Sequence, residues 1–67
     1  MGGMDWIDRL DKFANYVQKM QRQGWFLMEY EDRDWAVFKV GDVKIKSEID
    51  YDGKIIERKS KIKPKES

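Results

Sequence analysis

The stretch Gly24-Trp25-Phe26-Leu27-Met28-Glu29-Tyr30 decides the fold of this chain. A helical pattern of apolar residues ends at its glycine, and a strand pattern begins at its tryptophan. Both alternating sides of that strand are apolar, with Trp25 and Leu27 on one side and Phe26, Met28 and Tyr30 on the other. A strand in a domain of 67 residues can bury only one side in the core. The other side therefore faces water or a partner.

The residues before Gly24 are predicted to form one amphipathic helix over residues 5–23. Apolar side chains recur there at intervals of three and four residues, namely Trp6, Ile7, Leu10, Phe13, Ala14, Val17 and Met20. Asp5 suits the N-cap, and Asp8 stands three residues later, in the position of a capping-box acid. Gly24 suits the left-handed C′ position at which many helices end.

Four strand-like runs follow the helix, over residues 25–30, 35–40, 43–50 and 54–62. Gly41-Asp42 fits a two-residue type II′ turn, and Asp52-Gly53 is the strongest short-range hairpin signal in the chain. Residues 31–34 lack glycine and are predicted to form a four-residue loop closed by Tyr30 and Trp35. The predicted fold is α+β, with one N-terminal α-helix packed on one face of a four-stranded antiparallel β-meander (αββββ).

The turns determine which side chains share a face of the sheet. A two-residue turn at Asp52-Gly53 pairs Ile49 with Ile56, and the four-residue loop pairs Leu27 with Phe38. One face, which the helix is predicted to cover, then collects Trp25, Leu27, Ala36, Phe38, Val40, Val43, Ile45, Ile49, Ile56 and Ile62. A three- or five-residue loop after Tyr30 would instead turn the other side of the first strand into the core.

The opposite face combines aromatic side chains with lysines. Its three rows read Phe26, Lys39, Lys44 and Lys61, then Met28, Val37, Lys46 and Lys59, then Tyr30, Trp35, Glu48 and Glu57. Exposed apolar patches usually mark binding sites. Lysines directly opposite each other repel, and a bound polyanion would relieve that repulsion. Rings that stack on bases, beside lysines that contact phosphates, are typical of proteins that bind single-stranded nucleic acid.

The sequence therefore predicts a non-enzymatic binding module that holds nucleic acid, in particular a single strand, on this face. The predicted site consists of Phe26, Met28, Tyr30, Trp35, Val37, Lys39, Lys44, Lys46, Lys59 and Lys61. The alternative is a protein-interaction module, either a homodimer or a small phage-type inhibitor or regulator, that uses the same aromatic residues. A plainer interpretation also stands, in which the lysines are a solvated face and protect the edge strands.

Composition argues against several classes of site. The chain has no cysteine and no histidine, so it offers no disulfide, no thiolate ligand and no imidazole base. Asp50-Tyr51-Asp52-Gly53 lacks the acid spacing of a calcium loop and is interpreted as a turn. We find no Gly-rich phosphate loop and no nucleophile–base pair, and we expect no enzyme activity, cofactor, metal or small-molecule substrate.

Charge is distributed unevenly along the chain. Residues 1–34 carry five basic and seven acidic side chains, a net of −2, and residues 35–67 carry nine basic and six acidic, a net of +3. No apolar run approaches the roughly 20 residues of a membrane span, and the N-terminus lacks a signal-peptide layout. We expect a cytoplasmic protein whose composition suits a phage or a thermophile equally. Its single domain should cover residues 5–62, between a flexible start (1–4) and a flexible basic tail (63–67).

Overall fold

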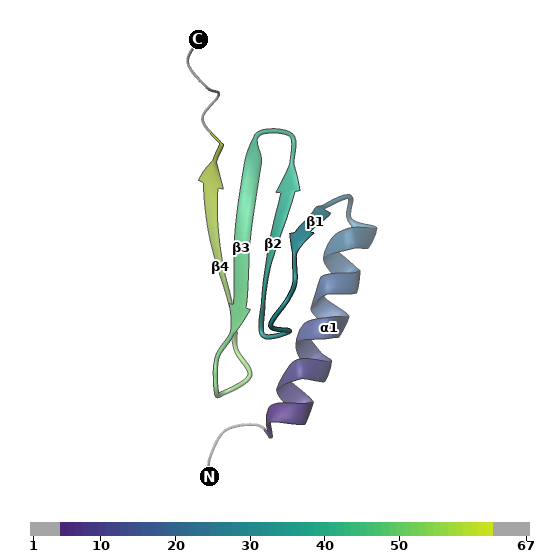
Figure 1. Cartoon of the computed structure of the whole chain (residues 1–67), viewed down its shortest axis with the longest axis vertical. Helices are drawn as coiled ribbons and strands as arrows, with labels where there is room; N and C mark the ends of the chain where they lie inside the picture. Colours follow the sequence, from purple (N-terminus) through teal and green to yellow (C-terminus); the bar gives the residue numbers. More distant parts are fainter. Residues whose placement is uncertain (1–4, 63–67) are drawn as a thin grey trace.

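The computed structural model describes residues 5–62, which form one α-helix and four β-strands. The helix α1 spans Trp6–Arg22, and the strands are β1 (Phe26–Glu29), β2 (Trp35–Val40), β3 (Val43–Ile49) and β4 (Ile55–Lys61). The strands form one antiparallel sheet in the order β1-β2-β3-β4, with α1 beside β1 and β4 farthest from it (Figure 1). This confirms the predicted α+β fold, αββββ. The predictions for residues 1–4 and 63–67 fall outside the described residues.

The two ends of α1 differ in how they are capped. Asp5 has the extended backbone of an N-cap, but its side chain makes no capping hydrogen bond. At the other end, Gly24 has a φ of 101°. Its N–H donates to the Gln21 carbonyl (3.0 Å), and the Trp25 N–H donates to the Met20 carbonyl (3.1 Å). These two bonds form a Schellman motif, which ends the helix and turns the chain into β1.

The core lies between α1 and one face of the sheet. Its buried members are Phe13, Val17 and Met20 from the helix and Ala36, Phe38, Ile45 and Ile49 from the strands. The first turns of α1 do not reach this core, because Trp6 and Ile7 are 63% and 61% exposed despite their apolar spacing. Val40 was also predicted on the covered face, yet it is largely exposed beside the β2–β3 turn.

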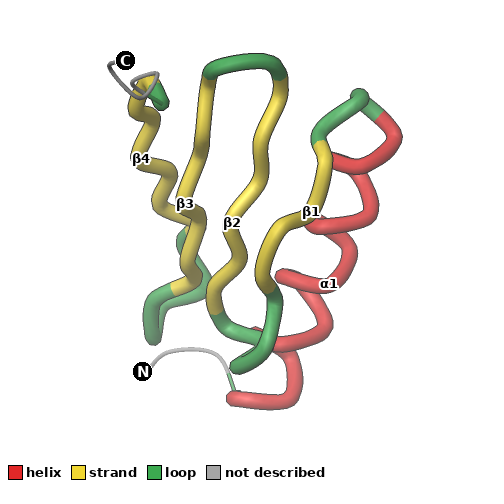
Figure 2. Tube along the Cα trace, turned by 45° about the horizontal axis from the view of Figure 1, so that its top comes forward, coloured by secondary structure: helices red, strands yellow, loops and turns green. Residues whose placement is uncertain are grey.

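The β2–β3 hairpin has the predicted register. Val40 pairs with Val43 across the Gly41-Asp42 turn, and Gly41 has a φ of 59°. This turn lies at one end of the molecule. The β1–β2 loop, the β3–β4 loop and the start of α1 lie together at the other end (Figure 2).

The register between β1 and β2 is as predicted only at its start. Leu27 pairs with Phe38, but an irregularity then places Glu29 opposite Val37. The prediction that Tyr30 lies opposite Trp35 is therefore wrong. A β-bulge adds one residue to a strand and exchanges the faces of the residues that follow. Tyr30 accordingly packs on the helix side, with its ring centroid 6.0 Å from that of Phe13.

The register between β3 and β4 differs from the prediction by one residue. Ile49 pairs with Ile55, not with Ile56, because the connecting loop has three residues where two were expected. The Gly53 N–H donates to the Asp50 carbonyl (3.0 Å), and Gly53 has a φ of 82°. This is the type I turn followed by a left-handed glycine that three-residue hairpin loops use. The Asp50 side chain also accepts hydrogen bonds from the N–H groups of Asp52 (3.0 Å) and Lys54 (2.9 Å).

The one-residue change turns every side chain of β4 to the other face. Ile55, Glu57, Lys59 and Lys61 lie on the helix side, and Ile56, Arg58 and Ser60 lie on the opposite side. The predicted placement of Ile56 in the core and of Lys59 and Lys61 on the exposed face is therefore wrong.

Candidate nucleic-acid interface

The sheet face opposite α1 is the candidate site, and we call it the open sheet face. Paired residues share a face, so the strand pairs define its rows. They are Phe26, Lys39, Lys44 and Ser60, then Glu29, Val37, Lys46 and Arg58, then Trp35, Glu48 and Ile56. Met28 lies at the irregularity in β1 and is exposed.

Four cations occupy the middle of this face in two adjacent rows. Lys39 lies directly opposite Lys44, and Lys46 lies directly opposite Arg58. Arg58 also approaches Glu48, with 3.9 Å between its Nη2 and the carboxylate Oε2, but both side chains are well exposed. An exposed ion pair of this kind contributes little. Within residues 5–62, Lys39 and Lys44 of the first row have no such ion-pair partner.

Two aromatic side chains lie at the ends of the face. Phe26 is 68% exposed on the edge strand β1. Trp35 is half-buried, and its indole N–H donates to the Asp32 carboxylate (2.6 Å), which fixes the ring. The Lys46 ammonium lies 5.4 Å from the centroid of that ring, within the range of a cation–π interaction. Val37 is buried although it lies on the face opposite the helix.

The structure brings together six of the ten predicted site residues. These six are Phe26, Trp35, Val37, Lys39, Lys44 and Lys46, and Met28 lies at their margin. Tyr30, Lys59 and Lys61 lie on the helix side instead. Arg58 is a new member that the sequence interpretation missed. The signal for it was Asp50, a residue whose side chain commonly bonds to backbone N–H groups two or more residues later and so favours a longer loop.

A polar cluster on the opposite face links α1 to β3 and β4. The Tyr16 hydroxyl donates to the Glu57 carboxylate and lies 2.7 Å from the Ser47 hydroxyl. Ser47 is fully buried. Among the described residues, the Tyr16 hydroxyl is the one side-chain group that forms a hydrogen bond with it. Burial raises the pKa of Tyr16 to about 12, and the hydrogen bond to Glu57 acts in the same direction. The cluster therefore stabilises the protonated form of the Tyr16 side chain in the folded protein.

This pKa predicts a stability change at high pH. The folded-state pKa of Tyr16 lies above its ordinary value of 10.0, so its contribution is complete below pH 10 and is lost as the pH rises towards 12. We expect Tyr16→Phe to lower the free energy of unfolding by about 1–3 kcal/mol at neutral pH, because the buried Ser47 hydroxyl loses its partner. Urea unfolding at a series of pH values should show this difference shrinking between pH 10 and 12. A difference that stays constant over that range would contradict the assignment.

Other classes of site find no support among the residues that the structure describes. Within residues 5–62, no group of three or more Asp and Glu side chains is placed to hold a metal ion. The one helix in that range is too short and too polar to cross a membrane. No protein-family model, curated protein or solved structure matches the chain. The case for a function therefore depends on the geometry of its surfaces.

Proposed function

We propose that this protein is a binding module that holds single-stranded nucleic acid on the open sheet face. The observation that carries the proposal is the pair of adjacent rows in which Lys39 opposes Lys44 and Lys46 opposes Arg58. Like charges directly opposite each other destabilise an antiparallel sheet. A phosphate backbone that runs across these rows would remove the repulsion and release its own counterions.

The aromatic residues specify which kind of polyanion fits. Lys39, the partner of Phe26, is four positions after Trp35 along β2, so the two rings stand about 13 Å apart along the strand. Unpaired bases can stack on such rings at both ends of the face while the backbone crosses the cations between them. The bases of a duplex are already stacked on one another, so a duplex would use only the cations. Stacking and phosphate contacts accept most sequences, so we expect little sequence preference.

Lys46 has two roles in this proposal. In the free protein its ammonium covers one side of the Trp35 ring. A base that stacks there would displace the lysine, which can then contact a phosphate. We place the protein in the cytoplasm, where nucleic acid is available. Disulfides are rare in that compartment, which agrees with a chain that has no cysteine.

The test is size-exclusion chromatography with light scattering, with and without a mixed-sequence DNA oligonucleotide of about ten nucleotides, within the site sizes of single-strand binding folds. We expect a monomer alone, a one-to-one complex at low salt, and quenching of tryptophan fluorescence on binding. Affinity should fall steeply with salt. A plot of the logarithm of the association constant against the logarithm of the salt concentration should have a slope of about −0.7 for each phosphate contact.

Two results would contradict the proposal. The first is no complex and no change in fluorescence at low salt. The second is a dimer in the absence of oligonucleotide that Phe26→Ala converts to monomer. The dimer result would assign the open sheet face to the alternative role, contact with a second copy of the chain.

A further inference from the structure

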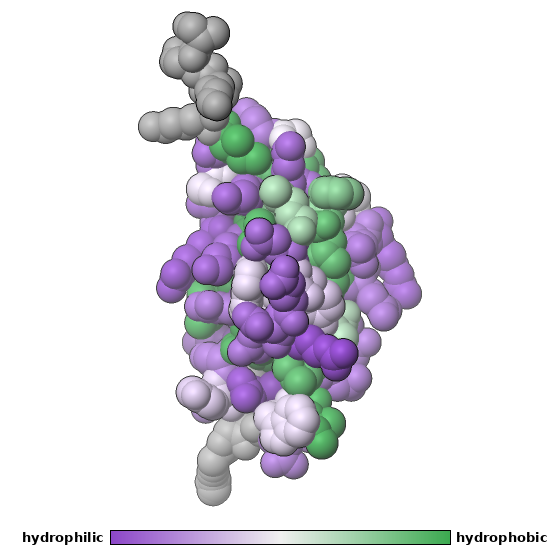
Figure 3. Space-filling view, in the orientation of Figure 1, coloured by the Kyte–Doolittle hydropathy of each residue, from purple (hydrophilic) through white to green (hydrophobic). Residues whose placement is uncertain are grey.

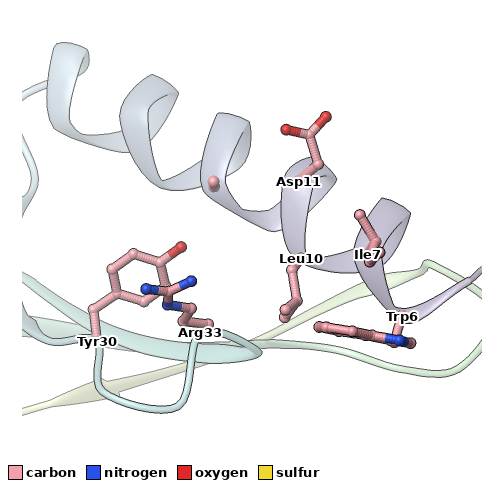
Figure 4. Close-up of a pocket in the computed structure, with 7 residues that line it drawn as sticks. Trp6, Ile7, Leu10, Asp11, Tyr30 and Arg33 are labelled. Carbon is pink, nitrogen blue, oxygen red and sulfur yellow. The ribbon is translucent and has the colours of Figure 1, made fainter.

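The two edges of the sheet differ in how well they are protected from a further strand. β1 is four residues long, its pairing with β2 is irregular, and α1 lies beside it (Figure 1). Leu10 of α1 and Tyr30, in the segment after β1, line a shared pocket of about 550 Å³ (Figure 4). Short strands, irregular pairing and a covering helix all keep another chain from adding to an edge. The β1 edge is therefore closed.

Within the described part of the chain, the β4 edge has none of these three protections. β4 has seven residues, and seven consecutive pairs join it to β3 without an irregularity. It is the last strand of the sheet that residues 5–62 form, and α1 lies beside the opposite edge (Figure 1). Among those residues, one side of β4 therefore has no neighbouring strand.

The backbone of β4 presents a regular row of outward-facing donors and acceptors. Just before β4, the Asp50 N–H donates to the Lys54 carbonyl (3.0 Å). Just after it, the Ile62 N–H donates to the Asp42 carbonyl (2.7 Å). Ladder bonds between antiparallel strands involve every second residue, so the even-numbered residues of β4 bond to β3 and the odd-numbered ones point outward. The outward N–H and carbonyl groups belong to Ile55, Glu57, Lys59 and Lys61.

Positive charge is concentrated along the same edge. The last five residues of β4 carry three basic side chains and one acidic side chain, a net of +2. Hydrophilic side chains line most of this side of the molecule (Figure 3). The one carboxylate, that of Glu57, already accepts a hydrogen bond from the Tyr16 hydroxyl. Within residues 5–62, Lys59 and Lys61 are in no ion pair. The edge is therefore protected by charge alone, which repels basic strands and attracts acidic ones.

We infer that β4 takes up an acidic, extended segment of a partner protein as an additional antiparallel strand. Backbone hydrogen bonds to the outward groups of β4 would hold the segment, and side chains would select it. Its carboxylates would lie directly opposite Lys59 and Lys61, the two cations that the open sheet face does not use. Nucleic acid fits this edge less well, because phosphates only accept hydrogen bonds and leave the outward carbonyls without donors. A second copy would bring two cationic edges together, which like charges oppose.

The probe is a labelled peptide of about seven residues, as long as β4 and antiparallel to it. It carries Glu opposite the three cations, Val opposite the two isoleucines and Thr at the other positions. Fluorescence anisotropy with the full chain should show saturable binding, and a peptide with Lys in place of Glu should bind about tenfold more weakly or less. No binding of the Glu peptide, or equal binding of the two peptides, would overturn the inference.

N-methylation of the peptide tests whether backbone pairing holds it. In one variant the methyl groups replace the two N–H hydrogens that face β4 opposite Glu57 and Lys59. In the other they replace the two that face away, opposite Arg58 and Ser60. We expect the first variant to bind about tenfold more weakly than the unmodified peptide, and the second to bind nearly as well as it. Equal affinities of the two variants would mean that charge alone attracts the peptide, and would contradict strand addition.

Two matched substitutions in the protein place the peptide on β4. Lys59→Glu reverses a charge at the centre of the edge and should weaken binding about fivefold or more. Lys19→Glu makes the same change at an exposed position of α1, beside the opposite edge, and should leave affinity near that of the wild type. Circular dichroism checks that both variants fold. Equal loss in both variants, or a dimer of the free protein that Lys59→Glu dissociates, would contradict an acidic strand partner at β4.

Discussion

Replacing Phe38 with alanine is expected to lower the free energy of unfolding by about 3–5 kcal/mol, the usual cost of truncating a buried phenylalanine. Phe38 is fully buried in the centre of β2 and packs against the Tyr16 ring, 6.0 Å away between centroids. A domain of this length has a total stability of roughly 3–10 kcal/mol. The variant should therefore lose a large part of its stability and unfold at a much lower urea concentration than the wild type, which far-UV circular dichroism would follow.

Phe26→Ala is the matched control for this prediction. It removes the same side chain from the neighbouring strand, but on the open sheet face, where Phe26 is mostly exposed. We expect its free energy of unfolding to stay within about 0.5 kcal/mol of the wild type. If the two variants unfolded at the same urea concentration, the assignment of β2 faces would be wrong. Phe26→Ala should also weaken oligonucleotide binding, because a stacking surface is lost.

Lys44→Glu is expected to change stability and nucleic-acid binding in opposite directions. In the wild type Lys44 lies directly opposite Lys39, and the substitution converts this repulsive pair into an attractive one. The free energy of unfolding should rise by about 0.2–1 kcal/mol. Affinity for single-stranded DNA should fall about tenfold at low salt, and the salt slope should decrease by about 0.7 or more, because a phosphate contact is lost.

Lys59→Glu supplies the matched control, because it makes the same charge change on β4. Lys59 pairs with Ile45 and therefore lies on the helix side of the sheet. It should weaken oligonucleotide binding much less than Lys44→Glu does, because its side chain leaves the sheet on the face opposite the proposed site. A loss equal to that of Lys44→Glu would mean that nucleic acid does not use the open sheet face as proposed. Lys44→Glu with unchanged affinity would favour an ordinary solvated face.

The sequence was sufficient to predict an element where one conformation buries far more apolar surface than the alternatives. The helix has a single apolar stripe and ends at Gly24, where a left-handed residue makes the Schellman bonds. Gly41-Asp42 closes a two-residue turn, and Val40 pairs with Val43 as predicted. Phe13 and Phe38 could be assigned to the core from periodicity alone, because one side of each element is clearly more apolar at these positions.

The candidate site was less predictable, because it depends on strand registers. In β4, Ile55 and Ile56 are adjacent, so either residue can face the helix with similar burial. Bonds to the Asp50 side chain and the left-handed Gly53 then favour the three-residue loop. That choice placed Arg58 on the open sheet face and moved Lys59 and Lys61 away from it.

The same reason explains the stretch from Gly24 to Tyr30. Its sequence determined that a strand begins after the helix and that both of its sides are apolar. Because both sides are apolar, burial alone could not choose between registers, and a single irregularity in β1 sent Tyr30 to the helix side and Glu29 to the open sheet face. Only the tertiary structure decided this, since the choice depends on how β1 meets β2 and how far α1 extends beyond the sheet. The pocket that Tyr30 lines together with Trp6, Ile7 and Leu10 from the first turns of α1 is a result of that packing.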